Sequence, residues 1–445
     1  MNARSALRRY MLVAFLTWLP LGLMMPVMVL LMTERGLSLA QVGLVTTVFS
    51  IVTITLELPT GGLADVVGRR VVLAASAAFT LGALALMAVS TTVWMFLGMA
   101  VLKGVGRALS SGPATAWYVD TLHELEGRDA DLGRGLARGG AMEAAALCLG
   151  VLAGGFVPLV VPPGPLPPLA VPALAGAVAA AVLLVVVLIA LPEPSRDTYG
   201  KRDRYGKTDG RGTLRGLVRE VPATVGGGVR LVAGAPVLRR LMLVAAGSGV
   251  ALTAVELLTP GRLAELAGTA EQGSTAYAIV AALGFAGSAA GSAMAPRVAR
   301  LAGRATAAGG PAPVAGAVAG TLLTGASVAA LAATAGLGGA AGLVTAGTAY
   351  VVLFAGLSVA GLLCLEMTHK AVDAGRRNTV TSTSSLALQA GGAASNLGFG
   401  ALATGAGTAA AWSVAACLIM ASASLFVRMP RTSPAPGPQV RSGSG

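Results

Sequence analysis

The sequence predicts an all-α membrane protein with twelve transmembrane helices in two six-helix bundles. Of its 445 residues, 55% are hydrophobic and 11% are charged, and the mean hydropathy is +0.77, whereas an average soluble domain is about a quarter charged. Twelve apolar runs each have close to the roughly 20 residues that cross the hydrocarbon core of a bilayer. A polar stretch after the sixth run divides them into two equal sets.

In chain order, the runs predict twelve helices and a division into four parts. The predicted helices are 10–32, 41–63, 71–92, 94–118, 137–161, 169–191, 237–260, 275–297, 312–334, 340–366, 379–404 and 409–428. The predicted parts are an N-terminal bundle (1–192), a cytoplasmic linker (193–236), a C-terminal bundle (237–428) and a disordered cytoplasmic tail (429–445), whose Pro, Ser and Gly content is typical of disorder.

Basic residues test this count, because cytoplasmic loops collect Lys and Arg. With both termini inside, the predicted outer loops hold only Arg35 and Arg262 of the 32 basic residues. The net charge of +13 therefore indicates membrane topology and no nucleic-acid partner. We expect a multi-pass protein of the plasma membrane with cytoplasmic N- and C-termini.

The stretch from Glu57 to Arg70 lies at the junction of the second and third runs, and its loop holds one carboxylate, Asp65, and two arginines among several glycines. We expect a tight loop there, since Gly61, Gly62 and Gly68 permit an abrupt reversal. This stretch resembles the loop between helices two and three of major facilitator superfamily transporters, and the resemblance extends over nearly the whole chain. The motif positions that match are Gly61, Asp65, Gly68, Arg69 and Arg70.

The resemblance implies a transporter that works by alternating access, with a charge network at this loop. Family members often carry an acidic residue at the position of Asp120 that meets the loop arginine. Asp65, Arg69 and Asp120, with Arg376 or Arg377 of the second half, would then form a conformational latch, an ion-pair network that holds the halves together in one state. The alternative is that these residues only set topology and cap helices.

Charged residues inside the predicted helices are further candidates, because each costs a few kcal/mol near the bilayer centre unless it faces protein or water. Lys103 and Arg107 are four residues apart and share one helix face. Drug-exporting members of the family often have an arginine in this helix before a glycine-rich segment, although here the glycine comes one place late. We expect at least one of Glu57 and Glu143 to be a proton-coupling site, and Glu256, near Pro260, is the next candidate. The alternatives are that Glu57 only forms hydrogen bonds at a helix end and that Glu143 lies at the water boundary.

The predicted function is proton-coupled efflux of a small amphipathic compound, as in multidrug antiporters. The methionines of the first helix suggest an adaptable cavity that lacks the polar density of a sugar site: Met24, Met25, Met28 and Met32. One alternative is an organic-anion transporter that uses Lys103 and Arg107. Another is a transport-inactive receptor or scaffold.

The sequence does not favour an enzyme, because it has no combination of nucleophile, base and metal ligands and no phosphate loop. The antiporter signature of the fifth helix is matched only in part, by Gly154–Pro158. We expect no cofactor and no metal, a small-molecule substrate, protons as the coupling ion, the lipid bilayer as surroundings, and a monomer.

Overall fold

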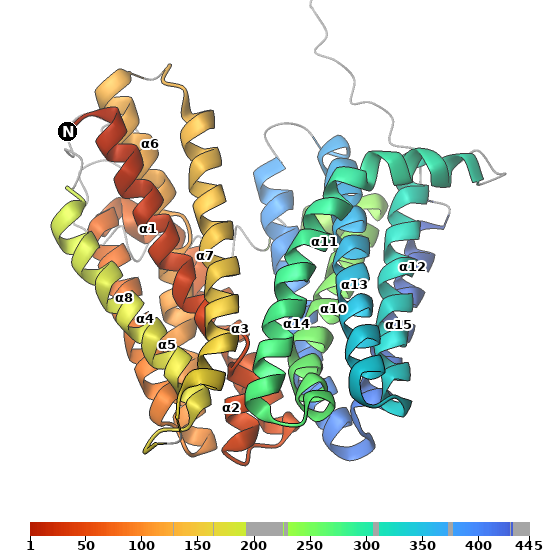
Figure 1. Cartoon of the computed structure of the whole chain (residues 1–445). Helices are drawn as coiled ribbons and strands as arrows, with labels where there is room; N and C mark the ends of the chain where they lie inside the picture. Colours follow the sequence, from red (N-terminus) through yellow and green to blue (C-terminus); the bar gives the residue numbers. More distant parts are fainter. Residues whose placement is uncertain are drawn as a thin grey trace, which may run out of the picture.

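The computed structural model describes residues 1–127, 129–162, 164–192, 226, 230–305, 311–372, 377–427 and 429. Over these residues the chain is helical and contains no strand, and Figure 1 shows two helical bundles side by side. The first bundle comprises α1 (Ala3–Met24), α2 (Met28–Glu34), α3 (Leu39–Val67), α4 (Arg69–Val89), α5 (Val93–Ser110), α6 (Pro113–Glu126), α7 (Leu132–Val160) and α8 (Val171–Ala190). The second comprises α10 (Pro236–Ala267), α11 (Ala270–Ala305), α12 (Ala312–Ala333), α13 (Gly339–Lys370), α14 (Arg377–Ala406) and α15 (Thr408–Ser422).

The predicted all-α fold with membrane-spanning helices is confirmed. Within the described ranges, 11 helical segments are long and apolar enough to cross a membrane. The remaining predicted span is α14, which has 30 residues and a sequence rich in Ser, Thr, Asn and Gln. The linker prediction falls almost entirely, and the tail prediction beyond Met429 entirely, outside the described residues.

Two predicted spans are not continuous helices. The first is interrupted at Met25–Val27, where Pro26 has no backbone N–H to continue the helical hydrogen bonds. The fourth is interrupted at Ser111 and Gly112, and Gly112 has φ +97°. Pro113 then occupies the first turn of α6, where a missing N–H costs nothing.

The predicted loop between Glu57 and Arg70 is much shorter than expected. Helix α3 continues through this stretch to Val67, and α4 begins at Arg69. The prediction that Gly61 and Gly62 take part in the reversal is therefore wrong. Gly68 alone makes the turn, with φ +112°, which side-chain-bearing residues rarely adopt.

The hydrophobic core is shared by the halves at one end of the molecule and divided at the other. We call the membrane side where α1 begins the N-terminal face, and the opposite side, where α2 ends, the far face. The largest cluster of buried residues draws on both halves around the far-face ends of the helices, for example Leu31, Leu258 and Phe399. Toward the N-terminal face each half has its own core, around Trp117 in the first and Leu241 in the second.

Figure 1 shows the same arrangement, because the bundles meet at the bottom of the view and diverge toward the top, where the N-terminus lies. The contacts between halves are made mainly by α3 with α14 and by α7 with α11.

Candidate functional site: a cavity between the halves

A central cavity of about 470 Å³ lies between the two bundles. Its walls come from α1 to α5 and α8 on one side and from α10, α11 and α14 on the other. The interruption of the first span places Met24, Met25 and Met28 in this wall. A volume of this size is within the usual range of roughly 300–1,000 Å³ for small-molecule sites.

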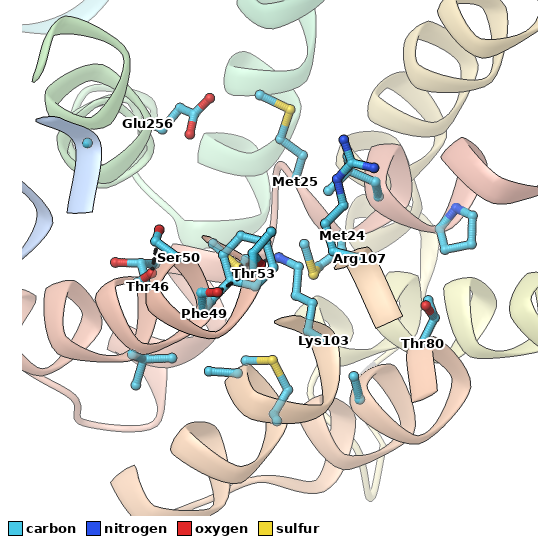
Figure 2. A pocket seen from close by; sticks show the side chains of 18 of the residues that line it. Met24, Met25, Thr46, Phe49, Ser50, Thr53, Thr80, Lys103, Arg107 and Glu256 are labelled. Atoms are coloured by element: carbon cyan, nitrogen blue, oxygen red, sulfur yellow. Dashed lines mark hydrogen bonds between the residues drawn. The ribbon is translucent and has the colours of Figure 1, made fainter. Parts of the chain in front are cut away.

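Two cations from α5, which share one face of this helix, line the cavity (Figure 2). Lys103 Nζ lies 4.6 Å from the centre of the Phe49 ring and 3.7 Å from the sulfur of Met28. Arg107 Cζ lies 4.8 Å from the centre of the Trp18 ring, and an Arg107 N–H donates to the Ser110 hydroxyl at 3.3 Å. Both cations are therefore held against aromatic faces.

The second half contributes one carboxylate to the cavity. Glu256 of α10 projects from the opposite wall and is exposed to the cavity, as Figure 2 shows. No ion pair joins it to Lys103 or Arg107 among the described side chains. Among the described residues, the charged side chains of the cavity wall are thus two cations of one half and one anion of the other.

Glu57 lies between the halves, beside the cavity wall. Its carboxylate accepts a hydrogen bond from the Gln389 amide of α14 at 3.2 Å and one from the Ser111 hydroxyl at 3.5 Å. Glu57 therefore connects α3 of one half to α14 of the other.

Glu143 is half-buried in α7 and is not part of the cavity wall. Two close contacts orient α7, since Gly139 packs against Tyr10 and Gly150 packs against Gly22. Among the described residues, no group of three or more His, Cys, Asp or Glu is placed to hold a metal ion.

The motif residues that the structure describes lie at the N-terminal face. Arg69 forms an ion pair with Asp120 and donates to the backbone carbonyl of Ala116, so it ties α4 to α6. Arg70 donates to the carbonyl of Leu188 in α8. The side chain of Asp65 and those of Arg376 and Arg377 are outside the described part of the structure.

Several residues of the cavity wall were not singled out by the sequence. The rings of Trp18 and Phe49 lie against Arg107 and Lys103, respectively. Gln389 and Asn396 of α14 contribute amide side chains to the wall. Aromatic residues make up only 4% of the chain, so an aromatic residue inside a span could have indicated a residue that lines the cavity. The polar side chains of α14 could have indicated the same, because polar side chains are unfavourable where a span faces lipid.

Solved structures of transporters share this fold. The nucleoside transporter NupG is 12% identical and superposes with a TM-score of 0.74 over 96% of this chain and 99% of that chain. A bacterial homologue of the human lysosomal transporter Spinster, in an inward-facing and occupied conformation, is 13% identical with a TM-score of 0.69 over 96% of each chain. A POT family transporter in complex with a thioalcohol-conjugated peptide is 12% identical with a TM-score of 0.67, over 94% of this chain and 95% of that chain.

At these identities the likeness establishes the fold alone, and no curated protein sequence matches the chain. The sequence model of the Major Facilitator Superfamily, however, matches residues 10–363. This match covers well over half of the chain and includes the Gly68–Arg70 turn, α5 with its two cations, and α10 with Glu256. The chain therefore belongs to the major facilitator superfamily.

Proposed function

We propose that the chain is a secondary active transporter that exports a small amphipathic compound by alternating access. The observation that carries this proposal is the cavity between the halves, with a core that is shared at the far face and divided toward the N-terminal face. A solute in such a cavity reaches the opposite side of the membrane when the two bundles rock about the cavity. The thioether and aromatic parts of the wall support an amphipathic solute, because methionine adapts to ligands of different shape.

The charged residues support proton coupling through Glu256. An ionised Glu256 attracts Lys103 across the cavity, and protonation removes this attraction. A proton therefore changes the relative free energies of states in which the halves are closer or further apart. Glu57 already accepts a hydrogen bond from Gln389, and Glu143 is not part of the cavity wall. Both are therefore weaker candidates for the coupling site than Glu256.

For the topology, we propose that the N-terminal face is cytoplasmic and that the protein is in the plasma membrane. Arg69, Arg70, Arg297, Arg300 and Arg304 are all near this face. A cysteine placed at Gly206 should then be protected from an impermeant reagent in intact cells. Strong labelling of that cysteine would overturn the orientation.

The latch remains part of the proposal, with Arg69 and Asp120 as its described members. Their ion pair lies within the first half, together with the Arg69 contact to Ala116. This arrangement supports a role for the pair in holding α4 and α6 in the orientation that one transport state requires. Asp65 and the glycines Gly61 and Gly68 would set the approach of α3 to this pair.

The function is tested by gradient-driven transport. In cells that lack other exporters, the protein should lower the accumulation of compounds from a panel of neutral, anionic and cationic amphiphiles. In proteoliposomes, transport of the affected compound should follow an imposed pH gradient. Glu256→Gln keeps the shape of the side chain but cannot ionise, so this variant should lose the response to the gradient.

Glu143→Gln is the matched control, because it makes the same chemical change on a helix face away from the cavity. A response that survives in Glu256→Gln and disappears in Glu143→Gln or Glu57→Gln would move the coupling site to that carboxylate. If no compound of the panel responds to the wild-type protein, the transport proposal fails in favour of a receptor or scaffold.

A further inference from the structure

We propose that the cavity binds organic anions: compounds in which a carboxylate, sulfonate or similar group is joined to an apolar body and is held by Arg107 and Lys103. This inference names the substrate class of the transport site and therefore rests on the proposed function. It is drawn from how the two cations are held and from the composition of the wall around them.

The cations lie one helical turn apart on α5 and face one space. Residues at this spacing have Cβ atoms about 5–6 Å apart. The charged ends rest on different rings, Phe49 for Lys103 and Trp18 for Arg107, so one anionic group contacts both when the two long side chains turn toward it. Burying two like charges so close together in a site within the membrane is unfavourable unless negative charge is supplied. The described part of the protein supplies it only from a distance, because Glu256 faces the same space from α10 and forms no ion pair with either cation.

The partners that the cations do have are weak and replaceable. Lys103 rests on the Phe49 ring and the Met28 thioether, and Arg107 rests on the Trp18 ring. A cation on an aromatic face gains about 0.5–1 kcal/mol at an exposed site and roughly 2 kcal/mol when desolvated. Hydrogen bonds between a guanidinium and a carboxylate are about twice as strong as neutral ones and are often bidentate. An incoming anion therefore gains from both cations without breaking an ion pair.

Arg107 and Lys103 would play different parts in this site. The guanidinium of Arg107 has a planar fork of donors that matches a carboxylate or sulfonate, and only one described side chain, Ser110, shares its hydrogen-bonding capacity. Lys103 offers a compact charge on a flexible stem, which suits a second contact to the same group. Arg107 thus selects the shape of the anion, and Lys103 adds charge.

The rest of the cavity wall is mostly apolar and suits a ligand whose remaining part is also apolar. Met24, Met25, Leu21, Leu252 and Leu257 surround the charged groups, and the aromatic faces of Trp18 and Phe49 lie directly under the cations. A ligand whose apolar ring packs against these methionine and leucine side chains while its anionic group meets the cations uses both features at once. A cationic ligand would have one carboxylate to pair with and two cations to repel it, so this class is disfavoured.

The experiment measures binding to the purified full-length protein by isothermal titration calorimetry. The probes are naphthalenesulfonate, the neutral naphthalenemethanol and the cationic naphthylmethylammonium, which share one ring system and differ in charge. We expect the sulfonate to bind at least about tenfold more tightly than the alcohol, which corresponds to roughly 1.4 kcal/mol. The ammonium compound should bind most weakly.

Variants assign this preference to the two cations. In a protein with both Lys103→Gln and Arg107→Gln, the sulfonate should lose its advantage while the alcohol binds as before. Arg107→Lys keeps the positive charge but loses the planar pair of donors, so this variant should keep part of the preference for the sulfonate over the alcohol. It also provides a test of the site if the double variant does not fold. Arg138→Gln is the control, because Arg138 is an exposed residue of α7 outside the cavity wall.

Two results would overturn the inference: equal or tighter binding of the alcohol or the ammonium compound by the wild-type protein, or an unchanged sulfonate preference in the double variant. Gradient-driven transport of neutral or cationic compounds without sulfonate binding would leave the proposed function standing and remove this substrate class. Cation-dependent sulfonate binding without transport of any compound would support the anion site and contradict the proposed transport function.

Discussion

The two ends of the interface between the halves are held together by different physical means. At the far-face end, backbones approach each other directly: Gly43 of α3 meets the carbonyl of Asn396 in α14, and Gly155 of α7 meets Ala278 and the carbonyl of Ser274 in α11. The Thr275 hydroxyl adds a hydrogen bond of 2.7 Å to the Gly155 carbonyl. Small residues allow this approach, which gains van der Waals contact between the far-face parts of the two helices.

Toward the N-terminal face, side chains replace backbone contact. Each half has its own core there, and the hydrogen bond from Gln389 to Glu57 crosses between the halves beside the cavity. Arg69, by contrast, is paired within its own half. The far-face end therefore depends on close backbone packing, whereas toward the N-terminal face the halves are joined by a polar side-chain contact that is easily exchanged.

The largest expected effect comes from filling the far-face contact. In Gly43→Ala, the new methyl group would overlap the Asn396 carbonyl, and overpacking of this kind typically costs about 1–3 kcal/mol. Because this cost falls only on the state in which α3 and α14 are in contact, the far-face ends should separate. Spin labels at Thr91 and Thr269, in a chain without its native cysteines, should report a longer distance by pulsed electron paramagnetic resonance.

Gly398→Ala is the matched control, because a Cβ at this position in α14 meets nothing within 4 Å. This variant should keep the wild-type distance and transport rate. If Gly43→Ala leaves the label distance unchanged while the protein is folded, the far-face contact does not set the population of states.

A smaller but still large effect is expected from Arg69→Ala. The variant should insert and fold, but transport should fall by about tenfold or more, because a change of about 1.4 kcal/mol alters the ratio of two states tenfold. Arg134→Ala provides the comparison: its ion pair with Asp131 is 3.6 Å long, with both side chains mostly exposed, and such surface pairs contribute little. Transport is measured in proteoliposomes at matched protein amounts. Equal rates for the two variants would indicate that the motif sets the membrane topology and does not control the transport states.

The smallest effect is expected where one hydrogen bond crosses between the halves. Gln389→Ala removes the donor to Glu57, and a hydrogen bond of this kind contributes about 1 kcal/mol. Labels at Glu126 and Arg304, near the N-terminal face, should therefore show a broader distance distribution and a few-fold change in transport rate. Ser385→Ala serves as the control, because it removes a contact to Gln389 within α14 and leaves the crossing bond in place. If the distance distribution of Gln389→Ala is as narrow as that of the wild type, the hydrogen bond between Gln389 and Glu57 does not hold the two halves together.

The sequence predicted what depends on hydropathy and on local spacing. Apolar runs located the spans, because the bilayer requires about 20 such residues whatever the helix touches. The spacing of Lys103 and Arg107 placed both on one face of α5, and both residues line one cavity. The turn at Gly68 was also predicted, although not its confinement to that single residue.

Only the tertiary structure decided which side of each helix faces the cavity. Glu143 and Glu256 are equivalent as isolated carboxylates in apolar runs, yet Glu256 faces the cavity and Glu143 does not. The rotation of α7 is set by its glycine contacts to Tyr10 and Gly22, which no local pattern reveals. Lipid tails and protein interior are equally apolar, so the sequence of a membrane helix carries little hydrophobic signal for its own rotation, and packing against neighbouring helices determines it.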